Sequence, residues 1–301
     1  PDVASIYDVP LNFEQDNLGD RLLDSLSLSK EKVADFTDWK KFVEGTKITT
    51  PELSIGIVGK YFDTGDFVLS DAYLSVIEAL KFSGAALGVK PKIEWINAKQ
   101  IEKDADAEAL LSKYDGIIVP GGFGETGIEG KIKAAKYARE HKLPYFGLCY
   151  GMHMLVIEYA RNILGLAGAH TVEIDPAAAH PVVDVMPDQK DKIAKSDMGG
   201  TMRLGEYPAH LQKGTHAFKA YGKDIISERH RHRYEFNNDY REEMDNAGLQ
   251  VVGINPETDL VEIVELENHP YFVGVQFHPE FKSRPMHPHP LFVGLIKAAI
   301  N

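Results

Sequence analysis

The chain contains a single cysteine, Cys149, among its 301 residues. One cysteine excludes an intramolecular disulfide and a cysteine-based metal cluster within the chain, and it is typical of a reducing compartment where a thiol stays reactive. Long apolar runs are also lacking, because no stretch approaches the roughly 18 residues of a membrane-spanning helix. We therefore expect a cytoplasmic protein that does not enter a membrane.

Positive charge is scarce too. The chain has 33 lysines and arginines against 45 acidic residues, and its net charge of -12 argues against binding to nucleic acid. No Gly-x-x-x-x-Gly-Lys-Ser/Thr phosphate loop is present, so the chain itself is not expected to bind ATP in that manner. A hydrophobic content of 44% suffices for a large core.

The pattern along the chain predicts two parts. Residues 1–50 carry apolar stripes at helical spacing, and Thr49-Thr50-Pro51 marks a boundary to residues 51–301. There, short apolar runs alternate with helical patterns, which is typical of an α/β fold with a parallel sheet. The expected strands are 53–58, 92–96, 116–119, 145–148, 181–186, 202–207, 233–237, 250–254, 260–266 and 271–277, and the expected helices are 71–87, 129–141 and 291–300.

Cys149 lies between two glycines directly after the apolar run 145–148. A nucleophile on a sharp strand-to-helix turn needs small neighbours, which Gly147 and Gly151 supply. The following helix would place the thiol at its N-terminus, where the helix dipole favours the thiolate. We interpret Cys149 as a nucleophile; the alternative is a buried core cysteine.

The run 275–280 supplies partners for this thiol. A thiolate attack needs an imidazole to manage protons and a third group to orient the imidazole, and His278 and Glu280 fit these roles. We expect the strand 271–277 to continue into an extended His278, so that residues two apart project the same way. The alternative is an ordinary loop histidine.

A glycine-rich loop, residues 120–124, follows another buried strand. Its backbone N–H groups can point to the place where an oxyanion develops, and we expect the N–H groups of Gly122 and Tyr150 to be the oxyanion donors. The alternative is a plain glycine-rich turn.

Two further groups invite a functional interpretation. The basic run 229–233 could neutralise an anion such as a substrate carboxylate, although a strand face exposed to solvent is the alternative. His287 and His289 lie in a proline-rich segment without a third ligand at convincing spacing, so we expect no metal site.

Taken together, these motifs resemble the class I glutamine amidotransferases, and within them the glutaminase domain of CTP synthases. The resemblance implies an α/β fold with an open, mostly parallel, flavodoxin-like sheet flanked by helices, with extra short antiparallel strands. Residues 5–26 resemble the end of the preceding synthetase domain, so residues 1–50 would be its tail and linker, and the chain a piece of a longer protein. The matching segments are 57–61, 70–76, 120–124, 129–132, 147–149, 200–205, 231–237 and 274–285.

The resemblance also implies a reaction and a pocket. Cys149 would attack the side-chain amide of L-glutamine, release ammonia and leave a glutamyl thioester that water hydrolyses, with His278 and Glu280 completing the triad. The residues that would bind glutamine are Gly122, Phe123, His153, Glu173, which meets the α-ammonium group, and Arg233 with Tyr234, which meet the carboxylate.

Partners and cofactors follow from the same resemblance. Ammonia would pass to the synthetase domain, outside this chain, which aminates phosphorylated UTP to CTP with ATP and Mg²⁺ in a homotetramer. GTP would act as an activator, and the segment 200–205, with Thr201 and Arg203, would form a lid linked to it. No cofactor is expected in this chain itself.

Two positions depart from the family pattern. His153 stands where the family usually has glutamine in its pocket, and a neutral imidazole donates one hydrogen bond where an amide donates two. Thr126 stands where many relatives have an arginine that supports GTP activation. Two alternative functions remain: a hydrolase of γ-glutamyl amides or peptides on the same fold, and a weakly catalytic domain for docking or assembly.

Overall fold

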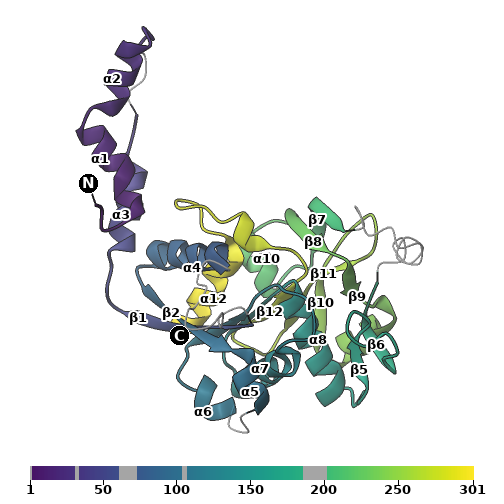
Figure 1. Ribbon diagram of the computed structural model, residues 1–301. Helices are drawn as coiled ribbons and strands as arrows, with labels where there is room; N and C mark the ends of the chain where they lie inside the picture. The colour runs from purple at the N-terminus through teal and green to yellow at the C-terminus, as the bar shows by residue number, and fades with distance from the viewer. Residues whose placement is uncertain (1, 31–33, 61–72, 104–106, 186–201) are drawn as a thin grey trace.

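The structure, a computed structural model, describes residues 2–30, 34–60, 73–103, 107–185 and 202–301 (Figure 1). It consists of an N-terminal helical segment and an α/β domain whose central sheet is covered by helices on both faces. Among these residues, no helix combines the length and the apolar character needed to cross a bilayer.

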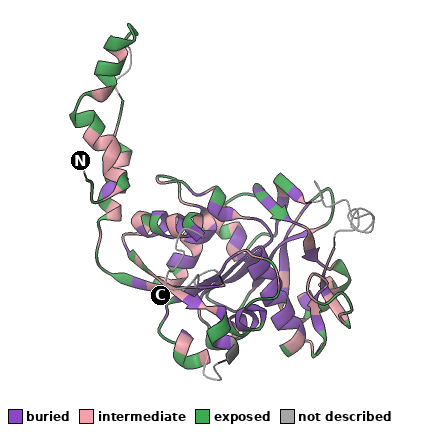
Figure 2. Cartoon of the chain, viewed as in Figure 1, coloured by how far each residue is buried: buried purple, intermediate pink, exposed green. Residues whose placement is uncertain are grey.

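The N-terminal segment contains a 3-10 turn and three helices, as the sequence predicts: α1 (Val9–Gln15), α2 (Leu18–Ser25) and α3 (Thr37–Thr46). It extends away from the domain, and its surface is mostly exposed or half-buried (Figure 2). Its anchor is an aromatic cluster in which Tyr7 and Phe42 pack edge-on against each other and against Phe82 of α4 (Leu74–Leu87). Trp39 adds a hydrogen bond to this cluster, because its indole N–H donates to the carbonyl of Tyr7 at 2.9 Å.

The central sheet has the strand order β2-β1-β3-β4-β12-β11-β10-β7-β8. The first five strands run parallel, in the flavodoxin-like order, and the last four continue the same sheet in antiparallel pairs. The predicted fold class is therefore confirmed. The strands are β1 (Glu52–Gly59), β2 (Lys90–Asn97), β3 (Gly116–Val119), β4 (Tyr145–Leu148), β7 (Arg203–Leu211), β8 (Ile225–His232), β10 (Leu249–Ile254), β11 (Val261–Leu266) and β12 (Phe272–Val275).

Successive side chains of the parallel strands point to opposite faces of the sheet, so there is one hydrophobic core on each face. On β3, Ile117 and Val119 face one core while Ile118 faces the other, and this is why the strand reads as a continuous apolar run. One core lies under α7 (Ile128–His141) and α8 (Tyr150–Asn162), with α5 (Ala98–Lys103) and α6 (Ala107–Leu111) beside them. The other lies under α4, α10 (His216–Tyr221) and α12 (Pro290–Ile300).

A second, three-stranded sheet packs beside α8 and is made of β5 (Ala169–Thr171), β6 (His180–Val185) and β9 (Tyr234–Phe236). The short helix α11 (Arg241–Ala247) follows it and leads into β10. The sequence predicts β6 and β9, but not β5, α10, α11 or β8, which have few consecutive apolar residues. Because β3, β4 and β12 are parallel neighbours, the loops after them meet at one edge of the sheet.

We predict that Phe42→Ala loosens the N-terminal segment without unfolding the α/β domain, because Phe42 is buried only in the small cluster with Tyr7 and Phe82. The free energy of local opening of α3 should fall by about 3 kcal/mol. Native-state hydrogen exchange of the α3 amides measures it. The control is Phe13→Ala, whose side chain is 51% exposed; equal protection of α3 in both variants would contradict the prediction.

Candidate active site

Cys149 occupies a strained turn between β4 and α8. Its backbone has φ 50° and ψ -102°, a conformation that costs a non-glycine residue energy, and it caps the N-terminus of α8. The N–H of Cys149 donates to the carbonyl of Val275 at 2.7 Å, and its own carbonyl accepts from Met152 at 3.0 Å. The predicted strand-to-helix turn is confirmed.

The two glycines are needed because helix and sheet touch there. A β-carbon on Gly147 would lie 2.7 Å from the carbonyl carbon of Gly151. A β-carbon on Gly151 would overlap the carbonyl oxygen of Val119, at the end of β3. The helix that follows Cys149 therefore approaches the strands as closely as a backbone can.

His278 and Glu280 form an ion pair, with 2.7 Å between Nδ1 and Oε1. Burial alone lowers the pKa of His278, but the carboxylate of Glu280 and the sulfur of Cys149 outweigh it, so the pKa lies well above its usual 6.5. The imidazole is thus held as an imidazolium between a carboxylate and a sulfur. The structure brings the three residues together, and their catalytic roles stay a prediction.

The geometry of this pair differs from the predicted extended strand. β12 ends at Val275, and residues 279–281 form a 3-10 helix with His278 as its N-cap. The side chains meet across this tight turn rather than along one face of a strand, because Pro279 starts the turn. The N–H of His278 donates to the carbonyl of Arg229 at 2.8 Å, which joins the turn to β8.

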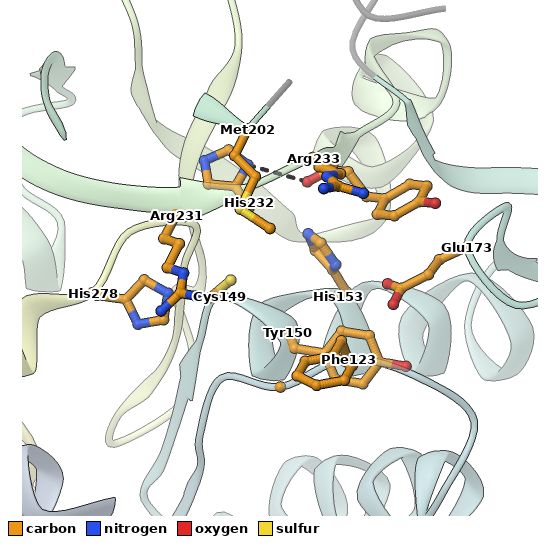
Figure 3. A pocket seen from close by; sticks show the side chains of 12 residues that line it. Phe123, Cys149, Tyr150, His153, Glu173, Met202, Arg231, His232, Arg233 and His278 are labelled. Carbon is orange, nitrogen blue, oxygen red and sulfur yellow. Dashed lines mark hydrogen bonds between the residues drawn. The ribbon is translucent and has the colours of Figure 1, made fainter. Parts of the chain in front are cut away.

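A cavity of about 580 Å³ opens beside Cys149, a volume within the ordinary range for small-molecule sites. Figure 3 shows Cys149 and His278 at one end of it and Glu173 and Arg233 at the other. It brings together nearly all the residues assigned to the site from sequence: Gly122, Phe123, Cys149, Tyr150, His153, Glu173, Arg233, Tyr234 and His278.

The end of the cavity remote from Cys149 carries two opposite charges, the carboxylate of Glu173 and the guanidinium of Arg233. Glu173 accepts from the N–H of Gly124 at 3.0 Å. Burial raises its pKa, an effect that this hydrogen bond and the charges of Lys60 and Arg233 partly offset. A ligand with a cationic and an anionic group on one carbon would find a partner for each.

His153 is held by a residue that the sequence analysis did not select. Its Nε2 lies 2.8 Å from Oε1 of Gln276, so Nε2 carries the proton, and Gln276 Nε2 lies 3.9 Å from the sulfur of Cys149. Burial lowers the pKa of His153 to about 4, so the ring is neutral at pH 7. Its Nδ1 is a buried acceptor without a partner among the described residues. One sequence signal marks Gln276 as a candidate site residue: it is a polar residue within the apolar run before His278.

The basic run divides between interior and surface. Along β8, His230 and His232 are buried while Arg229 and Arg231 point outward, and Arg231, His232 and Arg233 line the cavity. The solvent-exposed alternative therefore describes Arg229. Arg233 lies at the cavity, where an anion could reach it, and its role in binding stays a prediction.

Beneath β8 lies a buried ionic network that the sequence did not predict. Arg203 pairs with Glu262 at 2.6 Å and with Glu235 at 3.7 Å, while His230 and His232 contact the same two carboxylates at 2.6 and 3.3 Å. Arg203, expected in a lid, is thus 5% exposed at the start of β7. Thr201 lies outside the described residues, and Thr126 is exposed in the loop before α7.

Of the two histidines near the C-terminus, His287 is exposed and His289 has a structural role. His289 caps α12 by accepting from the N–H of Leu291, and its Nε2 lies 3.1 Å from Glu228. Within the ranges that the structure describes, no group of three or more His, Cys, Asp or Glu side chains could hold a metal ion. The chemistry available at the cavity is nucleophilic attack by the Cys149 sulfur on a carbonyl group, with His278 as the proton donor.

Comparison with known proteins gives a consistent result. The model of the family "Glutamine amidotransferase class-I" matches residues 68–298. The chain is 50% identical over 300 residues to the CTP synthase of Caldanaerobacter subterraneus subsp. tengcongensis and 51% identical over 298 residues to that of Clostridium acetobutylicum. These matches cover 100% and 99% of the chain but 54% of each relative, so the chain spans about half their length.

Among solved structures, the chain is similar to the glutaminase domain of Trypanosoma brucei CTPS with bound acivicin. The TM-score is 0.75 at 36% identity, and the match covers 82% of this chain and 94% of that one.

We predict that Gly151→Ala damages the turn, because its methyl group would overlap the Val119 carbonyl. The free energy of unfolding should fall by about 3 kcal/mol, and alkylation of Cys149 by iodoacetamide should slow. Urea unfolding and mass spectrometry measure the two effects. Gly19→Ala on α2, where no atom lies within 4 Å of the new methyl group, is the control; similar stability of both variants would refute the prediction.

We also predict that Glu280→Gln lowers the pKa of His278, since the carboxylate is the main cause of its elevation. A histidine whose folded pKa exceeds the usual 6.5 stabilises the fold fully below that pH, and this contribution is lost as pH rises through the folded pKa. The variant should therefore lose about 2 kcal/mol at pH 6 and less at alkaline pH. NMR titration of the ring and urea unfolding at several pH values test this, with the exposed Glu242→Gln as control. An unchanged titration would show that Glu280 does not act on His278.

Proposed function

Because the chain belongs to the class I glutamine amidotransferase family, we propose that it hydrolyses the side-chain amide of L-glutamine to glutamate and ammonia. The observation that carries this proposal is the arrangement of the cavity. The Cys149–His278–Glu280 group lies at one end, and the Glu173 carboxylate and the Arg233 guanidinium lie at the other. An α-amino acid with a side-chain amide fits this distribution of charge.

The reaction proceeds in two steps. The Cys149 sulfur attacks the amide carbon, and the negative charge on the amide oxygen is stabilised by the N–H groups of Gly122 and Tyr150. His278 gives its proton to the leaving nitrogen, so the C–N bond breaks, ammonia departs and a glutamyl thioester remains. Water then attacks the thioester carbon, His278 takes a proton from that water, and the C–S bond breaks to give glutamate and free Cys149.

The far end of the cavity orients the substrate. Glu173 binds the α-ammonium group, and Arg233 with Tyr234 binds the α-carboxylate. Phe123 lies at the mouth, 68% exposed. His153 lines the cavity, its single N–H is taken by Gln276, and its Nδ1 is buried. A histidine at this position therefore has no free N–H to donate to the substrate.

The ammonia serves a larger protein in this proposal. The relatives named CTP synthase are about twice as long as the chain, and we assign the ammonia to a synthetase domain that aminates phosphorylated UTP with ATP and Mg²⁺ in a homotetramer. GTP activation through the segment 200–205 belongs to the same proposal. The single cysteine supports a reducing, cytoplasmic location.

The test is glutamate release from glutamine by the chain and by Cys149→Ala, each with and without GTP. The substitution should lower the rate by a factor of about 10³ or more, because the remaining groups cannot form the thioester. Parallel assays with γ-glutamyl peptides distinguish a γ-glutamyl hydrolase. Glutamate release that survives Cys149→Ala, or peptides that react faster than glutamine, would overturn the proposal. Absence of turnover and of glutamine binding would favour a docking or assembly role.

A further inference from the structure

Lys131 is a fully buried lysine next to the site. It lies on α7 with 0% of its surface exposed, and its Nζ has no hydrogen-bond partner among the described residues. Lysine is almost never buried completely unless its charge is paired, because an unpaired ammonium group loses its hydration without compensation. A fold that keeps such a group beside a reactive cysteine calls for an explanation other than packing.

The ammonium group lies behind the two residues proposed to hold the oxyanion. Its Nζ is 3.5 Å from the place where a β-carbon of Gly122 would be, and it lies over the ring of Tyr150, 5.1 Å from the ring centre. The Tyr150 hydroxyl in turn donates to the carbonyl of Gly124 at 3.0 Å. Lys131 thus lies next to both the glycine-rich loop and the first residue of α8.

Few charges balance this ammonium group. Lys60, which follows β1, repels it, and Glu173, on the segment after β5, attracts it. From α8 it meets the Tyr150 ring, and Ala98 of α5 packs against the neighbouring Gly130. Burial, followed by the repulsion from Lys60, lowers the pKa of Lys131 to about 7, so its charge changes within the physiological range.

We propose that Lys131 is a positioning residue whose ammonium charge, acting through Gly122 and Tyr150, favours the oxyanion that forms during attack by Cys149. The charge lies behind the oxyanion donors, outside the cavity, so it makes no contact with the substrate. A positive charge there strengthens the field that the two N–H groups present and holds the Tyr150 ring by a cation–π contact. The inference rests on the proposed glutaminase function.

The decisive variant is Lys131→Met, which keeps the length of the side chain and removes its charge. At pH 6.5 its kcat should be lower by a factor of about ten, less than the loss of a direct oxyanion donor, with KM unchanged. Its urea midpoint should rise, because an unpaired buried charge is gone. Lys131→Leu serves as a second neutral variant, and Lys136→Met, exposed on the same helix, is the matched control.

The pH dependence separates this role from a structural one. Wild-type Lys131 loses its proton as pH rises through about 7, so the ratio of wild-type to variant kcat should fall towards one at pH 9. Burying the charge lowers the stability of the fold by its full amount below about pH 7. This loss of stability becomes smaller as pH rises towards 10.5, the usual pKa of lysine. The gain in urea midpoint should therefore shrink over the same range.

Two results would overturn the inference. One is a kcat equal to that of the wild type at pH 6.5, and the other is a loss of activity accompanied by a lower urea midpoint in both neutral variants. Cys149→Ala is assayed alongside. Activity that survives Cys149→Ala overturns the glutaminase function itself, whereas a Cys149-dependent activity that is indifferent to Lys131→Met overturns only the role of Lys131.

Discussion

The close approach of α8 to the strands is the constraint on which the site depends. Gly151 meets the Val119 carbonyl and Gly147 meets the Gly151 backbone, so no side chain can separate the helix from the sheet. This contact forces Cys149 into a strained backbone conformation with positive φ and places the residue at the helix N-terminus. The strained backbone is therefore that of the residue that carries the sulfur. The packed cores on both faces of the sheet offset the energy that this conformation costs.

The central sheet changes from parallel to antiparallel pairing at β12, and the antiparallel strands supply the remaining wall of the cavity. β12 pairs in parallel with β4 and antiparallel with β11, so the strands beyond it bring β8 and its following turn over the cysteine. The parallel half supplies the Gly122 loop and Cys149, while Arg231 and Arg233 come from the end of β8 and the turn after it. The hydrogen bond from His278 to Arg229 connects the two halves at the point where they share the site.

The sequence alone predicts what depends on local pattern. Glycine spacing identifies the Cys149 turn, and apolar runs identify the parallel strands. Glu173 is placed only by family resemblance, because nothing near it in sequence marks a pocket. The sequence does not predict β8 because, apart from Ile226, its inward side chains are Glu228, His230 and His232. These three are buried beside ionisable partners and leave no apolar period to detect. The contact of Gln276 with His153 joins distant segments, and no sequence pattern encodes it.

The pKa values of the two imidazoles in the site, His278 and His153, are shifted in opposite directions. Both are largely buried, which disfavours the charged form of each. Glu280 and the Cys149 sulfur reverse that effect for His278, whereas the neutral amide of Gln276 cannot do so for His153. One ring therefore holds a proton next to the Cys149 sulfur, while the other stays neutral beside Gln276. Gln276 touches both His153 and the Cys149 sulfur. A single amide thus orients the neutral ring and contacts the sulfur that lies beside the charged ring.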